Sequence, residues 1–195
     1  MWGRYNMKKI LLIIALAFCI FQMVVLAVAI DMGNAATDRA SSTSFANTWI
    51  DRNNPANATG TITSIEIYIA TAVTGLDIGI FYVESGDTLS TRDDVTIGAL
   101  GAGYHQVDVD LDVVLGDYIG YTKDTGTVDV GSDVSTGEWY VDGDYVPCTS
   151  KAFTQYANRV HSLYATGATP PAGITWNGVT ITKWNGITIT KINGK

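Results

Sequence analysis

The sequence predicts an all-β fold, a jelly-roll-like antiparallel β-sandwich, because short alternating segments recur between glycine-rich turns. Residues 64–69 alternate isoleucine with polar or aromatic residues, and residues 107–112 alternate aliphatic residues with aspartate. Such period-two patterns are typical of strands with one buried face. The chain has 20 glycines and only four prolines, which favours tight turns between strands. Beyond the N-terminal apolar run, no stretch combines the 3.6-residue period of a helix with helix-capping residues.

The N-terminus has the pattern of an export segment. Three basic residues precede an uncharged, apolar run from Ile10 to Ile30, and Ala27-Val28-Ala29 offers small residues where a signal peptidase cleaves. We predict that residues 1–29 form a hydrophobic helix that acts as a signal peptide or membrane anchor. Cleavage after Ala29 is favoured, and a retained anchor is the alternative. Both place the remainder outside the cell or on its surface.

Charge and cysteine content exclude several classes of function. The formal net charge is −7, and it becomes −10 without the three basic residues of the export segment. An acidic chain is repelled by nucleic acid and by anionic lipid, so we expect no nucleic-acid partner and membrane contact only through the N-terminal segment. Cys148 is the one cysteine beyond that segment. A single thiol excludes an intramolecular disulfide and a zinc site, so we predict that Cys148 is a small apolar core residue, with an intermolecular disulfide as the alternative.

Composition divides the exported part into four segments. Residues 30–44 are small and polar without a period, which predicts a flexible N-terminal arm able to pair with a neighbour's sheet edge. Residues 45–165 carry the strand signals of the β-sandwich domain. Residues 166–173 include two prolines and form a linker. Residues 174–195 repeat Trp-Asn-Gly and predict a small β-hairpin or meander.

The C-terminal repeat has a period of eight residues with Asn-Gly in each copy, which is a hairpin signal. A two-residue Asn185-Gly186 loop divides the aliphatic residues between the two faces of the sheet. A three-residue loop, Trp184-Asn185-Gly186 with a glycine bulge, places them on one face, and we predict this form. The resulting apolar row must pack on the body of the same chain or on another copy, and it is our candidate assembly surface: Val179, Ile181, Ile187, Ile189 and Ile192.

Few residues offer chemistry. Asp108, Asp110 and Asp112 share one strand face and supply the oxygen ligands that Ca²⁺ takes, although a solvated strand face explains them as well and is the interpretation we favour. We therefore expect no cofactor. The two histidines, His105 and His161, have no partner nearby in sequence. A nucleophile elbow, a zinc motif and a phosphate-binding loop are missing from the sequence, so we predict that the protein is not an enzyme.

Two further features concern surface recognition. Trp139, Trp176 and Trp184 are candidate contacts for a glycan or a protein partner, because aromatic rings stack on sugars. Asn57 begins an Asn-Ala-Thr sequon and is the candidate glycosylation site.

Residues 54–62, leading into Ser64-Ile65-Glu66-Ile67, and the later segment 116–120 carry a family resemblance. Over roughly residues 45–165 the chain resembles jelly-roll domains of surface proteins from environmental bacteria and phages. The Trp-Asn-Gly tail is a second point of similarity. Some domains of this kind are protomers of extracellular fibrils built by one protein, with extended arms linking neighbours. The resemblance supplies no functional residues and implies structural or adhesive work.

These observations lead to two expectations about function. The first is a structural subunit of an extracellular filament or surface assembly, a homopolymer whose copies join by strand pairing through terminal arms. The alternative is a carbohydrate-binding or adhesion module on the cell surface.

Overall fold

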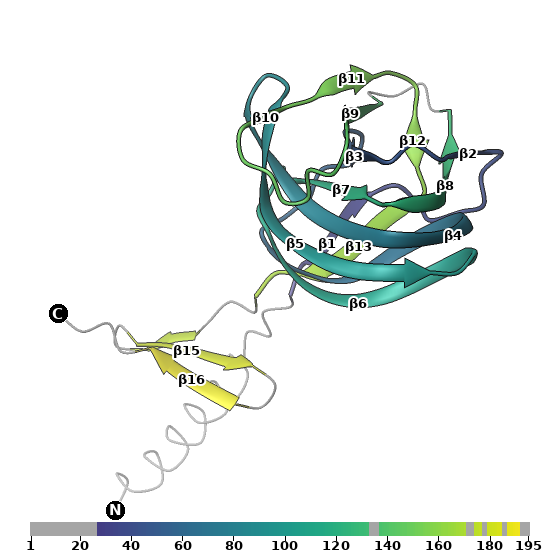
Figure 1. Cartoon of the computed structure of the whole chain (residues 1–195). Coiled ribbons are helices and arrows are strands. Elements are labelled where there is room, and N and C mark those ends of the chain that lie inside the picture. Colours follow the sequence, from purple (N-terminus) through teal and green to yellow (C-terminus); the bar gives the residue numbers. More distant parts are fainter. Residues whose placement is uncertain (1–26, 133–136, 171–173, 177–178, 185–186, 192–195) are drawn as a thin grey trace, which may run out of the picture. The chain divides into compact units, whose positions relative to one another are not determined.

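The structure, a computed structural model, describes residues 27–132, 137–170, 174–176, 179–184 and 187–191. It confirms an all-β protein (Figure 1). Residues 27–170 form one compact unit, here called the body, and the C-terminal strands belong to a separate unit. No helix within the described ranges is long and apolar enough to cross a membrane. The predicted export helix, up to Leu26, lies outside those ranges.

Thirteen strands of the body are linked into a large antiparallel sheet through one central strand. The N-terminal strands are β1 (Ala29–Gly33), β2 (Ser41–Thr43), β3 (Asn47–Asp51) and β4 (Gly60–Ser85). They are followed by β5 (Thr88–Leu100), β6 (Gly103–Val113), β7 (Tyr118–Thr122), β8 (Thr125–Gly131) and β9 (Glu138–Asp142). The last four are β10 (Lys151–Ala152), β11 (Thr154–Tyr156), β12 (Val160–His161) and β13 (Leu163–Ala168).

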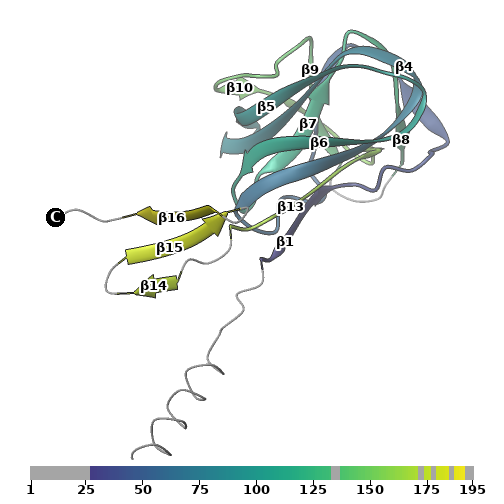
Figure 2. The ribbon, with the colours of Figure 1, turned by 90° about the horizontal axis from the view of Figure 1, so that it is seen from below.

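Strand β4 organises the body because both of its halves are central. Its first half pairs with β13 on one side and β6 on the other, and its second half pairs with β7 and β5. The middle pairs with β8. Strands β5 and β6 follow one another along the same side of β4, so residues 60–113 form one long hairpin. Figure 2 shows β4 curving between its two halves, which brings the two parts of the sheet face to face.

The core lies inside this fold. Its larger cluster takes the isoleucines of β4, including Ile65 and Ile78, which are 1% and 0% exposed. A second cluster forms around Phe81 and Trp139. Isoleucine and valine dominate because β-branched side chains pack well on pleated sheets. The result is sandwich-like and all-β, as the alternating pattern predicted.

The predicted flexible arm at residues 30–44 is wrong at both of its ends, where strands form. Ile30 and Met32 are 1% and 0% exposed, and strand β1 pairs with β13 at the edge of the sheet. Strand β2 pairs with β8. Only Ile30 and Met32 carry the alternating pattern of β1, and they adjoin the apolar run. The sequence alone therefore could not distinguish this strand from the export segment. The linker was predicted to begin at residue 166, but β13 extends to Ala168, so the start of the predicted linker belongs to a strand.

Gly126 holds β8 against the curved middle of β4. Its φ is +82°, and a Cβ at this position would lie 2.1 Å from the carbonyl oxygen of Ala72. We expect Gly126→Ala to lower the free energy of unfolding by about 2–5 kcal/mol, since left-handed strain and a backbone clash add. Gly98 has a similar φ of +85° with no atom within 4 Å. Gly98→Ala should therefore cost only about 1–2 kcal/mol in urea unfolding, and equal losses would contradict this account.

Candidate functional site

The outer edge of the long hairpin is the candidate functional site, and we call it the β5–β6 edge, meaning the outer sides of β5 and β6. Within the described residues, β6 pairs only with β4, and β5 pairs with β4 and, through Thr88 and Leu89, with β10. Apart from a hydrogen bond from the Thr91 N–H to the Cys148 carbonyl at 2.9 Å, the rest of this edge has no backbone pairing with another described segment. Unpaired strand edges of this length are sites where another strand can add.

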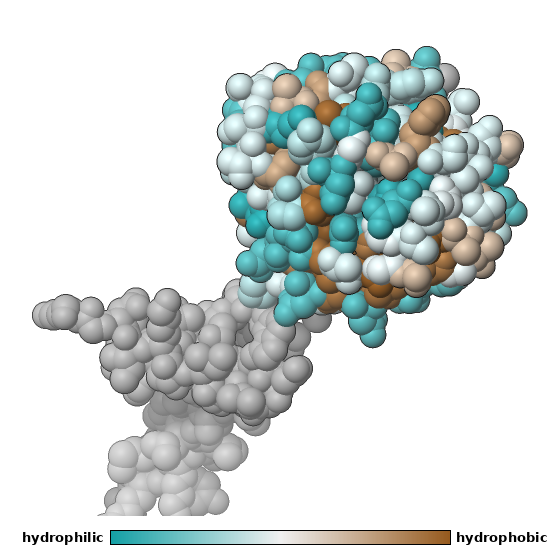
Figure 3. All heavy atoms as spheres, viewed as in Figure 1, coloured by the Kyte–Doolittle hydropathy of each residue, from teal (hydrophilic) through white to brown (hydrophobic). Residues whose placement is uncertain are grey.

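Apolar side chains along this edge are incompletely covered. Val95, Ile97, Leu100 and Val109 pack against the main core but are only partly buried. Their neighbours on β4 are almost fully buried; Val95, for example, pairs with Ile78. Figure 3 shows hydrophobic surface between polar side chains over β5 and β6. The hydrophobic core of the body is therefore incompletely covered along the β5–β6 edge.

Two polar contacts lie at one end of the edge, one between β5 and β6 and one between β5 and the turn after β6. The Asp93 carboxylate accepts a hydrogen bond from the Asp112 backbone N–H at 2.8 Å. Arg92 forms an ion pair with Asp117, and its Nη2 lies 3.0 Å from Asp117 Oδ1. These contacts occupy one end of the edge, so an incoming strand would compete with Asp93 for the N–H of Asp112.

The three aspartates predicted to share a strand face do so on β6. Asp108, Asp110 and Asp112 are all exposed. Among the residues the structure describes, no three His, Cys, Asp or Glu side chains are grouped as a metal ion requires. The carboxylates make a negatively charged face beside the open core.

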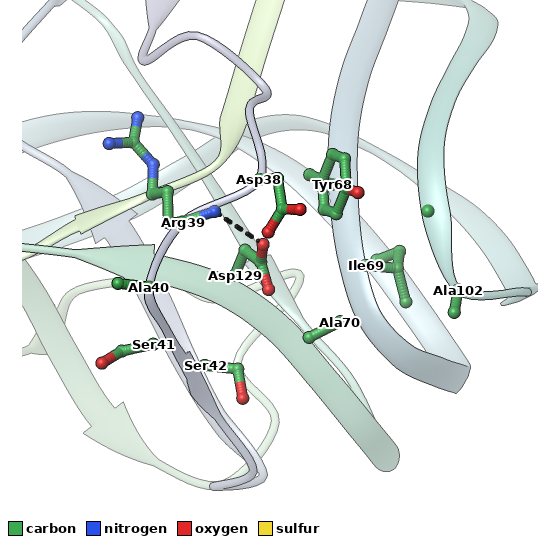
Figure 4. A pocket seen from close by; sticks show the side chains of 11 residues that line it. Asp38, Arg39, Ala40, Ser41, Ser42, Tyr68, Ile69, Ala70, Ala102 and Asp129 are labelled. Carbon is green, nitrogen blue, oxygen red and sulfur yellow. Dashed lines mark hydrogen bonds between the residues drawn. The ribbon is translucent and has the colours of Figure 1, made fainter.

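A second surface feature is an open groove of about 540 Å³ between β2, β8 and the curve of β4 (Figure 4). Asp38 lies beside the Tyr68 ring, and its negative charge raises the pKa of the Tyr68 hydroxyl. The Arg39 backbone N–H donates to Asp129 at 2.9 Å, and the Arg39 side chain donates to Ser162 and to the Ala35 carbonyl. The arginine is therefore engaged within the protein, and the groove offers mainly hydroxyls and carboxylates.

A buried polar cluster lies between β3, β7, β9 and β12. Glu138 is 0% exposed, and its Oε1 accepts hydrogen bonds from the His161 backbone N–H at 2.7 Å and from ring Nδ1 at 2.5 Å. The other oxygen lies 3.5 Å from Arg159 Nε. The Arg159 guanidinium also stacks over the Trp49 ring, 4.3 Å from its centroid.

Asp51 borders the same cluster and shares with Tyr121 and His161 a cavity of about 10 Å³. Burial, reinforced by the charge of Glu138, raises the pKa of Asp51 to about 7. Burial also raises the pKa of Tyr121 well above its usual value. In the described part of the chain, Asp51 Oδ2, Tyr121 Oη and His161 Nε2 have no hydrogen-bond partner. The cavity has the size and polarity of a site for one water molecule.

The remaining predicted surface residues have different outcomes. Trp139 is 5% exposed and its Nε1 donates to Asp87 at 2.7 Å, so it is a core residue and the predicted glycan contact is wrong. Asn57 is exposed, and its Oδ1 accepts from the Asp31 backbone at 3.2 Å. Cys148 is partly buried against the second core cluster. For Trp176 and Trp184 the structure describes only the backbone.

The C-terminal strands form a separate three-stranded sheet of β14 (Ile174–Trp176), β15 (Val179–Trp184) and β16 (Ile187–Lys191). Trp184 pairs with Ile187 and Ile181 with Thr190. This register contradicts the predicted three-residue loop. It gives two-residue Asn-Gly connections, and Val179 and Ile181 therefore do not share a face with Ile187 and Ile189. Ile192 lies outside the described residues.

Sequence reasoning missed the buried cluster. Glu138, His161 and Asp51 come from strands far apart in the chain, so no local spacing links them. The available signal was an acid inside the apolar segment Glu138-Trp139-Tyr140-Val141, since a charge on a buried strand needs a partner. That signal gives no indication of which residue the partner is.

Comparisons of the chain with protein-family models, with curated proteins and with solved structures found no match.

Proposed function

We propose that the protein is a structural subunit of an extracellular filament or surface assembly, whose copies join by strand pairing. The observation that supports this proposal is the β5–β6 edge, which combines incompletely covered apolar side chains with a backbone that, beyond the start of β5, pairs with no other described strand. Monomeric proteins usually protect such edges, whereas assembling proteins complete them with a strand from a neighbour.

The C-terminal sheet supports the same function. It has three strands of three to six residues and belongs to a unit separate from the body. A sheet of this size buries too little apolar surface to be stable alone. It therefore needs a surface on which to pack. Because the edge and the tail are different surfaces, their contact is heterologous and propagates into an open chain of subunits.

The proposal has three further parts. The body has jelly-roll topology, the N-terminal segment directs export and leaves the protein outside the cell or on its surface, and the protein carries out no catalysis and needs no cofactor. Each part follows from the patterns in the amino-acid sequence.

The alternative, a carbohydrate-binding or adhesion module, has weaker support. One of its three predicted tryptophan contacts, Trp139, is buried in the core. The groove beside Tyr68 supplies one aromatic ring with polar neighbours, which suits a sugar, but it does not explain the open core along β5 and β6.

Electron microscopy of the exported protein tests the proposal. We expect long particles in negative stain, and light scattering should show mass that grows with concentration. A chain ending at Pro170 keeps the whole compact body with its core and should stay monomeric. A full-length protein that remains monomeric at every concentration would contradict the proposed function.

A further inference from the structure

We infer that the β5–β6 edge is completed by a C-terminal strand of a second copy, which lies along β6 beside its aspartates. This inference rests on the proposed function and names the partner segment and its seat. It follows from charge, from residue alternation and from the path of the chain.

Charge is strongly separated along the sequence. Residues 27–170 contain all 19 acidic residues and six of the 12 basic ones, a formal charge of −13. Residues 171–195 contain no acid and three lysines, Lys183, Lys191 and Lys195. The tail is thus attracted to the body, and the exposed face of β6 with Asp108, Asp110 and Asp112 is a concentrated acidic strip beside an open edge.

The alternation of residues in the tail is also compatible with binding along β6. Both β15 and β16 alternate valine or isoleucine with threonine and end near a lysine. A strand with this pattern, added beside β6, directs one row of aliphatic side chains toward the core and one row of threonines to solvent. The aliphatic row then covers the partly buried Val95, Ile97 and Val109. Lysines at the strand ends meet the aspartates of β6.

The path of the chain favours a second copy as the donor. Strand β13, which precedes the tail, pairs with β4 on the side opposite to β6. Its last residue, Ala168, pairs with Thr61, and Thr61 pairs on its other side with Asp112. The last strand of the body therefore ends across β4 from the β6 edge. A strand from another copy approaches that edge without crossing the hairpin.

Binding of the tail as a separate peptide tests this inference. The body ending at Pro170 is titrated with a labelled synthetic peptide of residues 174–195, and fluorescence anisotropy is recorded. We expect saturable binding, weakened by salt, together with new protection of residues 103–113 from hydrogen exchange. A peptide carrying Ile187→Asp and Ile189→Asp should lose at least tenfold in affinity because its aliphatic row is interrupted.

Two double variants of the body, matched in net charge, show whether the peptide binds along β6. Asp108→Lys with Asp110→Lys should weaken peptide binding at least tenfold. Asp124→Lys with Asp142→Lys changes the net charge equally at exposed positions elsewhere and should leave most of the affinity. Equal losses in both double variants, or no binding of the native peptide, would overturn the inference.

Two outcomes separate this inference from the proposed function. If the full-length protein forms filaments while the peptide does not bind the body, the function stands and the joint is elsewhere. If the peptide binds but the full-length protein is a monomer with residues 103–113 already protected, the tail occupies its own edge, and both the second-copy donor and the filament are wrong.

Discussion

Glu138→Leu is expected to lower the free energy of unfolding by about 3–5 kcal/mol, the cost of breaking a buried ion pair. The Glu138 carboxylate is 0% exposed and contacts His161 through two hydrogen bonds and Arg159 through an ion pair. Leucine fills similar space but accepts no hydrogen bond. It leaves the buried His161 donors and the Arg159 guanidinium, whose side chain is only 14% exposed, without a carboxylate. Urea unfolding of the body measures the loss.

Conservative and control variants separate this effect from simple repacking. Glu138→Gln keeps an acceptor for His161 and should lose less than the leucine variant. Glu84 also accepts two hydrogen bonds, from Ser90 at 2.5 Å and Ser150 at 2.6 Å, but it is exposed. Glu84→Leu should therefore cost below about 1 kcal/mol. A Glu138→Leu variant as stable as the Glu84 control would show that the buried cluster adds nothing to stability.

Local alternation was enough to predict much of the fold. The patterns at residues 64–69 and 107–112 gave strands with the expected inward and outward faces, and Asp108, Asp110 and Asp112 are exposed as an alternating strand requires. Predicting these strands requires only that side chains alternate along a pleated strand and that one face of the strand is buried. No information about distant partners enters such a prediction.

Long-range pairing explains what the sequence did not predict. Gly75 interrupts the alternation of β4, so the local pattern does not show that one curved strand of 26 residues passes through both parts of the sheet. Strand β1 depends on β13, more than 130 residues later, to become ordered. The same holds for the β5–β6 edge. Val95 and Val109 have the same local sequence pattern as buried residues, so their partial exposure depends on which strands pair and not on that pattern.

The register of the C-terminal strands shows two local principles in competition. A three-residue loop collects the aliphatic residues on one face, whereas Asn-Gly favours a two-residue loop whose twist matches the flanking strands. The structure has the two-residue register. Turn chemistry outweighs amphipathicity here because a three-stranded sheet has little core of its own to reward a single apolar face.

Asp51 should make the stability of the body fall as the pH rises from about 4 to about 7. Burial, with a contribution from the charge of Glu138, raises the pKa of this carboxyl from 3.8 to about 7 in the folded protein. In that range the folded state keeps a proton that the unfolded chain has lost, so raising the pH favours unfolding. Hydrogen bonds from the backbone of Asn53 and the charge of Arg39 act in the opposite direction but are smaller.

Asp51→Asn isolates this contribution, because asparagine mimics the protonated acid and still offers an oxygen to the Asn53 N–H, which donates to Asp51 Oδ1 at 2.6 Å. Urea unfolding at pH 5 and pH 8 should show the native protein losing about 3 kcal/mol relative to the asparagine variant over that interval. At pH 8 the variant should be the more stable of the two, since it no longer buries a charge beside Glu138. Parallel pH profiles for the two proteins would mean that Asp51 titrates near its ordinary pKa and that water reaches the small cavity it shares with Tyr121 and His161.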